Sequence, residues 1–138
     1  MAMRTIAIIL RGLQFYAHNA HNLAKGPNFM QDHAFFGDLY ESYEEQYDSV
    51  VERIIGESGD DAVELSELTQ FASELNAKDK PTSSAEAYSS ILEQEGRLCD
   101  AIKGAISGES DGTQNLLQGI ADSSLVRQYK IQRRLKGK

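Results

Sequence analysis

The 138-residue chain has one cysteine, two prolines and no tryptophan, and it lacks any long apolar run. A single cysteine, Cys99, excludes a disulfide within the chain and fits a reducing compartment, so we expect a cytoplasmic protein. No apolar run approaches the ~20 residues that span a bilayer, and residues 6–10 are too few for a signal-peptide core. We therefore expect no membrane association.

The length fits a single domain over residues 1–138, because domains typically hold roughly 100–200 residues. Its charge is unevenly distributed. Six of the 14 basic residues and none of the 21 acidic ones lie in residues 127–138, so the first 126 residues carry a net charge of −13. The acidic body is expected to repel nucleic acid and attract cations, whereas the basic C-terminal end, 127–138, is a candidate for binding DNA.

Apolar residues recur at helical spacing along the chain, without a convincing strand-type alternation. The expected helices cover about residues 6–23, 28–56, 83–106 and 113–135. Gly26-Pro27 ends the first, Asn28 is the expected N-cap of the second, and Ser83 with Glu86 forms a capping box for the third. The sequence thus predicts four long helices.

The connections between these helices differ in length. Two short ones flank a long polar stretch at residues 60–80, in which the apolar residues of 63–75 predict one short helix. Short links join antiparallel neighbours, and one long crossover is typical of the ferritin-like form. We therefore predict an all-α fold, a ferritin-like four-helix bundle whose long crossover carries a short helix.

Iron centres inside such bundles usually rely on Glu-x-x-His motifs, and no glutamate here has a histidine three residues later. Glu95 falls among the apolar positions of the third helix. We interpret it as a paired structural residue, so the bundle interior is not the expected metal site.

The second expected helix carries three potential metal ligands, and the spacing between them is informative. His33 and Asp48 are 15 residues apart, or ~22 Å along a helix, so they cannot share a metal within one subunit. Asp48 and Glu52 lie four residues apart on one face, away from the apolar seam. Two antiparallel copies of this helix would bring His33 of one beside both carboxylates of the other. The alternative is an ordinary solvated acidic face shared with Glu41, Glu44 and Glu45.

One stretch of the chain resembles the Dps-type mini-ferritins. It runs His21-Asn22-Leu23-Ala24-Lys25-Gly26-Pro27-Asn28-Phe29 and is followed by His33 and by Asp48, Glu52 and Arg53. The family pattern is a His, a Lys/Arg-Gly-x-x-Phe turn, a second His, and Asp-x-x-x-Glu-Arg further along the second helix. The specific match covers residues 21–53, and the helix layout agrees over nearly the whole chain.

The resemblance implies a hollow homo-dodecamer with ferroxidase sites at its twofold interfaces. His21 and His33 of one subunit and Asp48 and Glu52 of its partner would bind iron there. The implied activity is the oxidation of Fe(II), with hydrogen peroxide as oxidant, and storage of Fe(III) mineral. We interpret His18, one turn before His21, as a surface histidine, with an outer ligand as the alternative.

The chain departs from the family pattern where an Asp usually follows the second His by four residues. Gly37 occupies that position, and Glu41, one turn further along, is the candidate substitute. A lost carboxylate would weaken the second iron position. Two alternatives therefore stay open: a DNA-binding shell with weak or no ferroxidase activity, and a catalytically silent shell protein.

Overall fold

The computed structural model describes residues 2–74 and 80–136, which are mostly helical and contain no β-strand. The long helices are α1 (Ala2–Leu23), α2 (Phe29–Ser58), α4 (Ser84–Ala105) and α5 (Asp111–Lys136). Shorter elements are η1 (Asp60–Ala62), α3 (Leu65–Ala72) and η3 (Ile106–Gly108). The prediction of an all-α fold is confirmed. Within the described ranges no helix is both long and apolar enough to cross a membrane.

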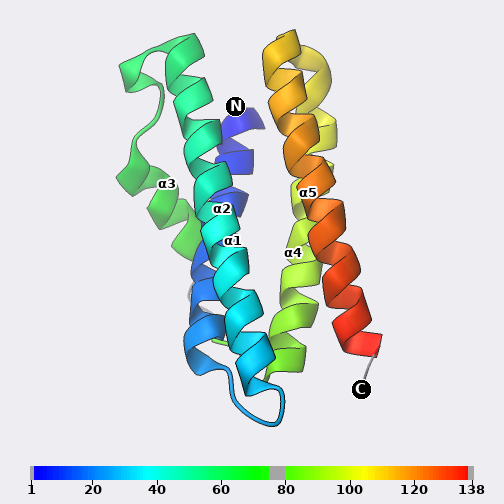
Figure 1. Cartoon of the computed structure of the whole chain (residues 1–138). Coiled ribbons are helices and arrows are strands. Elements are labelled where there is room, and N and C mark those ends of the chain that lie inside the picture. The colour runs from blue at the N-terminus through cyan, green and yellow to red at the C-terminus, as the bar shows by residue number, and fades with distance from the viewer. Residues whose placement is uncertain (1, 75–79, 137–138) are drawn as a thin grey trace.

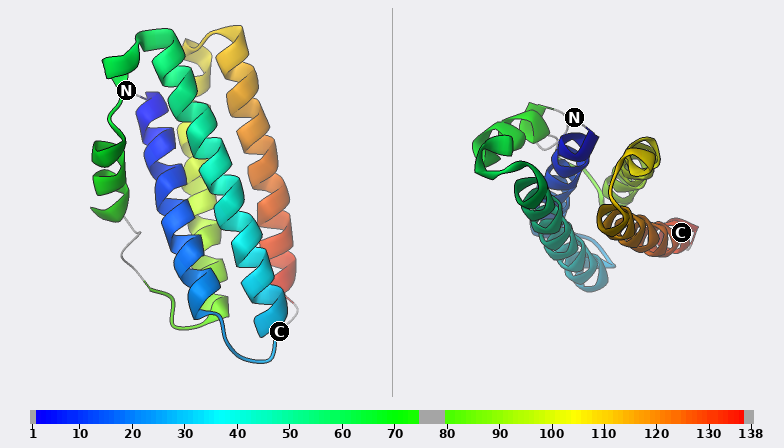
Figure 2. Two further views of the ribbon diagram at one scale, coloured as in Figure 1. Left: turned by 60° about the vertical axis from the view of Figure 1, so that its left-hand side comes forward. Right: turned by 90° about the horizontal axis from the view of Figure 1, so that it is seen from above.

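The four long helices form two antiparallel pairs, α1 with α2 and α4 with α5 (Figure 1). The helix α4 begins at the end of the molecule where α1 turns into α2, and α5 begins where α2 ends (Figure 1). Thus α2 and α4 run in the same direction. The short helix α3 lies against the outer side of α1 (Figure 2), where Arg4 pairs with Glu67 and Leu68 is fully buried.

The helix ends follow local sequence signals with one exception. Gly26 adopts φ +95° in the turn between α1 and α2, a conformation that favours glycine. The Ser83 hydroxyl accepts the backbone N–H of Glu86 at 3.1 Å, which is one half of the predicted capping box, while the Glu86 carboxylate accepts the Thr82 hydroxyl instead of the Ser83 N–H.

Asn28 stands at the predicted N-cap position before α2, and its carbonyl accepts the Asp32 N–H at 2.9 Å, but the predicted side-chain cap is absent. The Asn28 backbone, at φ −101° and ψ 21°, lacks the extended geometry of an N-cap, and its side chain makes no capping hydrogen bond.

The bundle core contains a buried ion pair. Glu95 is fully buried and accepts from Arg127 Nε at 2.5 Å and Nη2 at 3.1 Å. Ser124 Oγ donates at 2.7 Å, and the Tyr43 hydroxyl also donates to this carboxylate. Burial raises the pKa of Tyr43 well above its ordinary value, and the neighbouring Glu95 charge adds to the rise. The structural interpretation of Glu95 is confirmed.

Fewer basic side chains of the C-terminal end, 127–138, are exposed than the sequence predicts. Arg127 is only 6% exposed because it pairs with Glu95, and Arg134 donates two hydrogen bonds to Asp32 at 3.1 and 3.0 Å. Asp32 also accepts the Tyr88 hydroxyl at 2.8 Å. Two arginines of this segment therefore hold α5 to the rest of the bundle. The described basic residues of 127–138 that stay exposed are Lys130, Arg133 and Lys136.

Candidate metal centre

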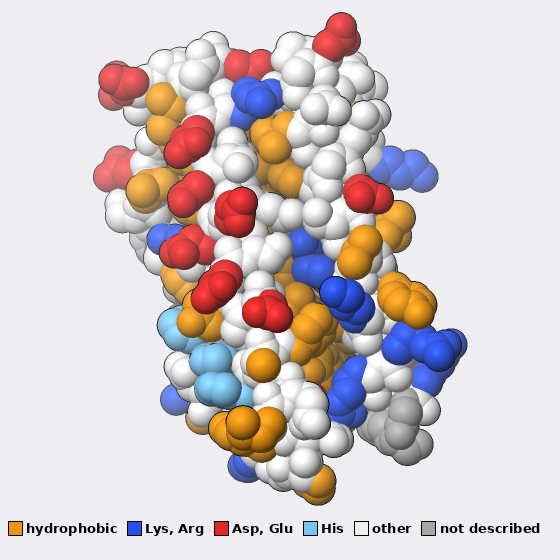
Figure 3. Space-filling view, viewed as in Figure 1, with side chains coloured by type: hydrophobic (Ala, Val, Ile, Leu, Met, Phe, Trp, Pro, Cys, Tyr) orange, Lys and Arg blue, Asp and Glu red, His pale blue; other side chains and the backbone are white. Residues whose placement is uncertain are grey.

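Two histidines meet where α1 turns into α2. His21 lies in the last turn of α1 and His33 in the second turn of α2. Their rings stack with centres 3.7 Å apart and planes 20° apart. Both side chains are partly exposed, and histidines gather on this face of the molecule at one end of α2 (Figure 3).

The two imidazoles are fixed by reciprocal hydrogen bonds. The Nδ1 of His21 lies 2.6 Å from the carbonyl oxygen of His33, and the Nδ1 of His33 lies 2.8 Å from that of His21. A carbonyl oxygen only accepts, so each Nδ1 must carry the hydrogen. In the neutral ring, Nε2 then keeps its lone pair, which is the form that binds metal ions. Backbone carbonyls in this role orient histidine ligands, so the pair is preorganised.

Gly37 is what allows His21 to approach the His33 carbonyl. A Cβ at position 37 would lie 3.1 Å from His21 Nδ1 and 3.2 Å from Cε1, closer than ordinary contacts. Any other side chain would therefore press on the His21 ring. The resemblance predicts a carboxylate at position 37. The glycine found there leaves room for the His21 imidazole. The sequence offered one signal, a glycine one helical turn after His33, but it did not reveal the His21 contact.

The predicted carboxylates lie apart from the histidine pair. Glu41, Asp48 and Glu52 are all exposed on α2. Acidic side chains form a column on this face that extends away from the histidines (Figure 3). Asp48 and Glu52 form no hydrogen bond or ion pair with another described residue. Within residues 2–74 and 80–136 of one chain, no three His, Cys, Asp or Glu side chains come together as a metal-binding group. The structure thus brings His21 and His33 together and leaves the three carboxylates separate.

Arg53, next to Glu52, is directed towards α5. Its Nη1 donates to Thr113 Oγ1 at 3.1 Å, and Thr113 in turn donates to Glu57 at 3.1 Å. Glu52 and Arg53 line an open groove together with Leu116. Arg53 is held by Thr113 and forms no ion pair with Glu52, which has no ion-pair partner among the described residues.

Other aromatic rings surround the histidine pair. Phe29 stacks on His33 with ring centres 5.0 Å apart, and Tyr40 meets His21 edge-on at 5.4 Å. His18 lies flat against Tyr40 at 4.2 Å and 15°. Tyr40 is only partly buried, unlike Tyr43, so it belongs to this surface cluster as well as to the seam of α2.

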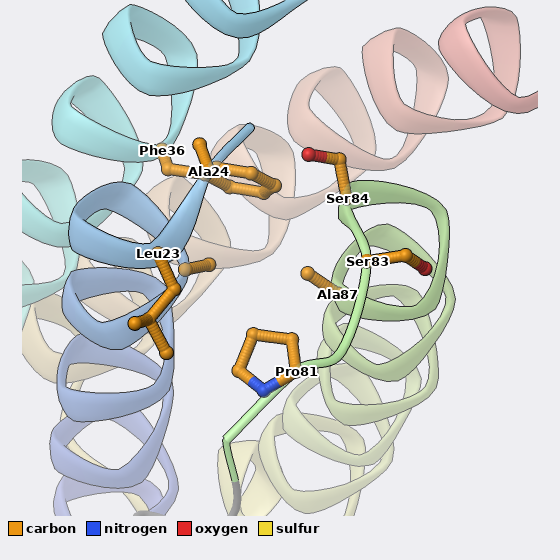
Figure 4. Close-up of a pocket in the computed structure, with 8 residues that line it drawn as sticks. Leu23, Ala24, Phe36, Pro81, Ser83, Ser84 and Ala87 are labelled. Carbon is orange, nitrogen blue, oxygen red and sulfur yellow. The ribbon is translucent and has the colours of Figure 1, made fainter. Parts of the chain in front are cut away.

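A cavity lies where the end of α1 and the start of α4 approach α2 (Figure 4). Phe36, Pro81 and Ser84 are among the residues that line it, and the Ser84 hydroxyl is buried without a protein partner. Its volume accommodates about one water molecule. This cavity is too small for a substrate.

No family model matches the chain, and no curated protein gives a significant match.

Proposed function

We propose that the protein is a ferroxidase resembling the Dps-type mini-ferritins, oxidising Fe(II) at sites between subunits and storing Fe(III) mineral in a hollow cytoplasmic shell. The histidine pair carries this proposal. His21 and His33 are locked so that each Nε2 atom is available to a metal ion of its own, while no described residue of the same chain completes a ligand set. A site that needs a second copy is what the 15-residue spacing on α2 favours.

Exposed side chains support the proposal that a second copy of the chain completes the site. Asp48 and Glu52 make no hydrogen bond or ion pair within residues 2–74 and 80–136 of their own chain, although both are charged and lie on one helix face. Phe29, which stacks on His33, is 37% exposed and Met30, three residues before His33 on α2, is 73% exposed, which is apolar surface that a partner subunit would cover. The parallel directions of α2 and α4 agree with a ferritin-like bundle and its long crossover (Figure 1).

The donor set suits iron chemistry. Imidazole nitrogens from one subunit and carboxylate oxygens from the other make a mixed site that leaves positions open for an oxidant. In the proposed reaction two Fe(II) ions each give one electron to hydrogen peroxide. The O–O bond breaks, and two Fe(III) ions and two hydroxide ions form. Glu52 is the candidate bridging carboxylate, and Glu41 is the candidate to compensate for the missing carboxylate at Gly37.

An anaerobic titration with Fe(II), followed by hydrogen peroxide, tests this function. We expect binding that saturates at one or two ions per subunit, then a rapid rise in Fe(III) absorbance when peroxide is added. Fe(II) that is not bound, or is oxidised no faster than in buffer, would contradict the proposal. Either result would favour a silent or DNA-binding shell.

The proposed shell makes a prediction about mass. Twelve subunits of 15.3 kDa give about 184 kDa, and light scattering should find this species at micromolar concentration. The reason is that the ligand set is incomplete in one chain and the apolar surface near His33 is exposed. A stable monomer would contradict the proposed assembly.

DNA binding is the second candidate function, favoured by the exposed Lys130, Arg133 and Lys136 on α5. Repeated over a shell, these cations would bind phosphates with a steep salt dependence. In a gel shift at low salt, K130Q/R133Q should weaken any DNA binding, whereas the charge-matched control R97Q/K103Q on α4 should not. DNA binding that is unaffected by K130Q/R133Q would contradict this mechanism.

A further inference from the structure

We propose that His18 and His21 form a second metal site, contained in one chain, for a divalent ion that prefers imidazole, Zn²⁺ or Cu²⁺. An ion bound there blocks the iron centre, because both sites use His21. The binding itself stands on the geometry of the two rings. Only its inhibitory consequence rests on the proposed function.

The separation of the two rings fits one ion. His18 and His21 are three residues apart on one face of α1, with ring centres 6.3 Å apart and planes tilted by 55°. Metal–nitrogen bonds are about 2 Å long, so two imidazoles on one ion keep their centres roughly 5–6 Å apart. Small side-chain rotations close the difference. The stacked His21 and His33 rings, at 3.7 Å, are too close to hold one ion without separating.

The available nitrogen atoms are also defined. His21 uses Nδ1 for the His33 carbonyl, so Nε2 is its free donor. His18 is exposed and makes no hydrogen bond to another described residue. Tyr40 lies flat against His18 and edge-on to His21, so a single ring contacts both imidazoles. His18 is exposed and His21 partly exposed, so both imidazoles can be reached from solvent.

The donor types select the class of ion. In the described part of one chain no carboxylate or thiolate joins these imidazoles, so water would complete the coordination. Imidazole-only sites favour Cu²⁺ and Zn²⁺ over Fe²⁺, in line with the general order of divalent metal affinities. The proposed iron site differs because it needs Asp48 and Glu52 of a second copy. One His21 Nε2 serves one ion at a time, so the two metals compete.

Calorimetric titration with Zn²⁺ on iron-free protein tests the binding site. H18A should weaken Zn²⁺ binding by at least about tenfold, because it removes one of two protein ligands. The double variant D48N/E52Q removes the carboxylates of the proposed iron centre, and the Zn²⁺ binding that depends on His18 should persist in it. His18 is exposed, so H18A should retain the helical content and mass of the parent, which circular dichroism and light scattering would check.

Zinc inhibition gives a second readout. The Zn²⁺ concentration that halves the rate of Fe(II) oxidation should rise at least about tenfold in H18A, relative to the parent chain. Unchanged Zn²⁺ affinity in H18A would overturn the proposal. So would zinc binding that is lost in D48N/E52Q but kept in H18A, since zinc would then occupy the intersubunit centre. If the parent chain does not oxidise iron, the proposed function fails, while the calorimetric comparison still decides the His18–His21 site.

Discussion

Replacing His33 or Glu52 by alanine should lower the initial rate of Fe(II) oxidation by at least about 100-fold, while the shell remains assembled. Each substitution removes one donor from every proposed site, and even residues that only orient metal ligands alter affinity or activity by about 10–100-fold. Both side chains are at least partly exposed, so their loss leaves the bundle core intact. Stopped-flow absorbance after addition of hydrogen peroxide measures the rate, and light scattering measures the assembly.

The matched carboxylate control is Glu93→Ala on α4, an exposed residue that pairs only with Arg97 one turn away. Its oxidation rate should equal that of the parent chain. Unchanged kinetics in both H33A and E52A would place the centre elsewhere.

Mixing the two inactive variants tests whether the site lies between subunits. When H33A and E52A chains are co-assembled at random, half of the twofold interfaces pair unlike chains. One of the two sites at such an interface combines an intact His33 with an intact Glu52. About a quarter of the parent activity should therefore return. No recovery in co-assembled shells would contradict the intersubunit site, because a site built from one chain cannot be complemented in this way.

Much of the fold could be predicted from the sequence, because its signals are local. The spacing of Phe36, Tyr43 and Tyr47 gives the buried face of α2, and all three are at most 1% exposed. Gly26 marks the end of α1, and Ser83 caps α4 as its motif predicts. Asn28 shows the limit of such signals, because the backbone geometry of the turn decided whether its side chain could act as a cap.

The candidate site was only partly accessible to sequence reasoning. The pattern of residue types singled out His21 and His33, but their reciprocal bonds depend on how the ends of α1 and α2 approach each other. The role of Gly37 has the same origin, because only the folded chain shows that a Cβ there would meet His21. Tertiary contacts of this kind have no local signal in the chain.

Sequence reasoning overestimated the exposed charge of the basic C-terminal end, and it did so for a different reason. A charge count treats Arg127 and Arg134 as equivalent to Lys130, although the first two contact buried carboxylates. The spacing of Arg127, Ile131 and Arg134 is four and then three residues, which is also the spacing of the apolar seam in α2. That periodicity was the available signal that these arginines face inward. Charges on the core-facing stripe of a helix are best interpreted as candidates for buried pairs.

The buried pair leads to the largest expected effect on stability. Glu95→Ala should lower the free energy of unfolding by about 3–5 kcal/mol, because it leaves the Arg127 guanidinium without a counter-charge in the core. It also removes the acceptor of the Tyr43 and Ser124 hydroxyls. Chemical denaturation followed by circular dichroism measures the change.

Two further variants separate the cost of an unpaired charge from the value of the pair. The double substitution E95M/R127M removes both charges and fills similar volume, so it should recover most of the stability lost in Glu95→Ala. Glu93→Ala, on the exposed side of the same helix, should change the free energy of unfolding by less than about 0.5 kcal/mol. If Glu95→Ala is no less stable than Glu93→Ala, then Arg127 must reach water when its partner is removed, and the pair does not hold α4 to α5.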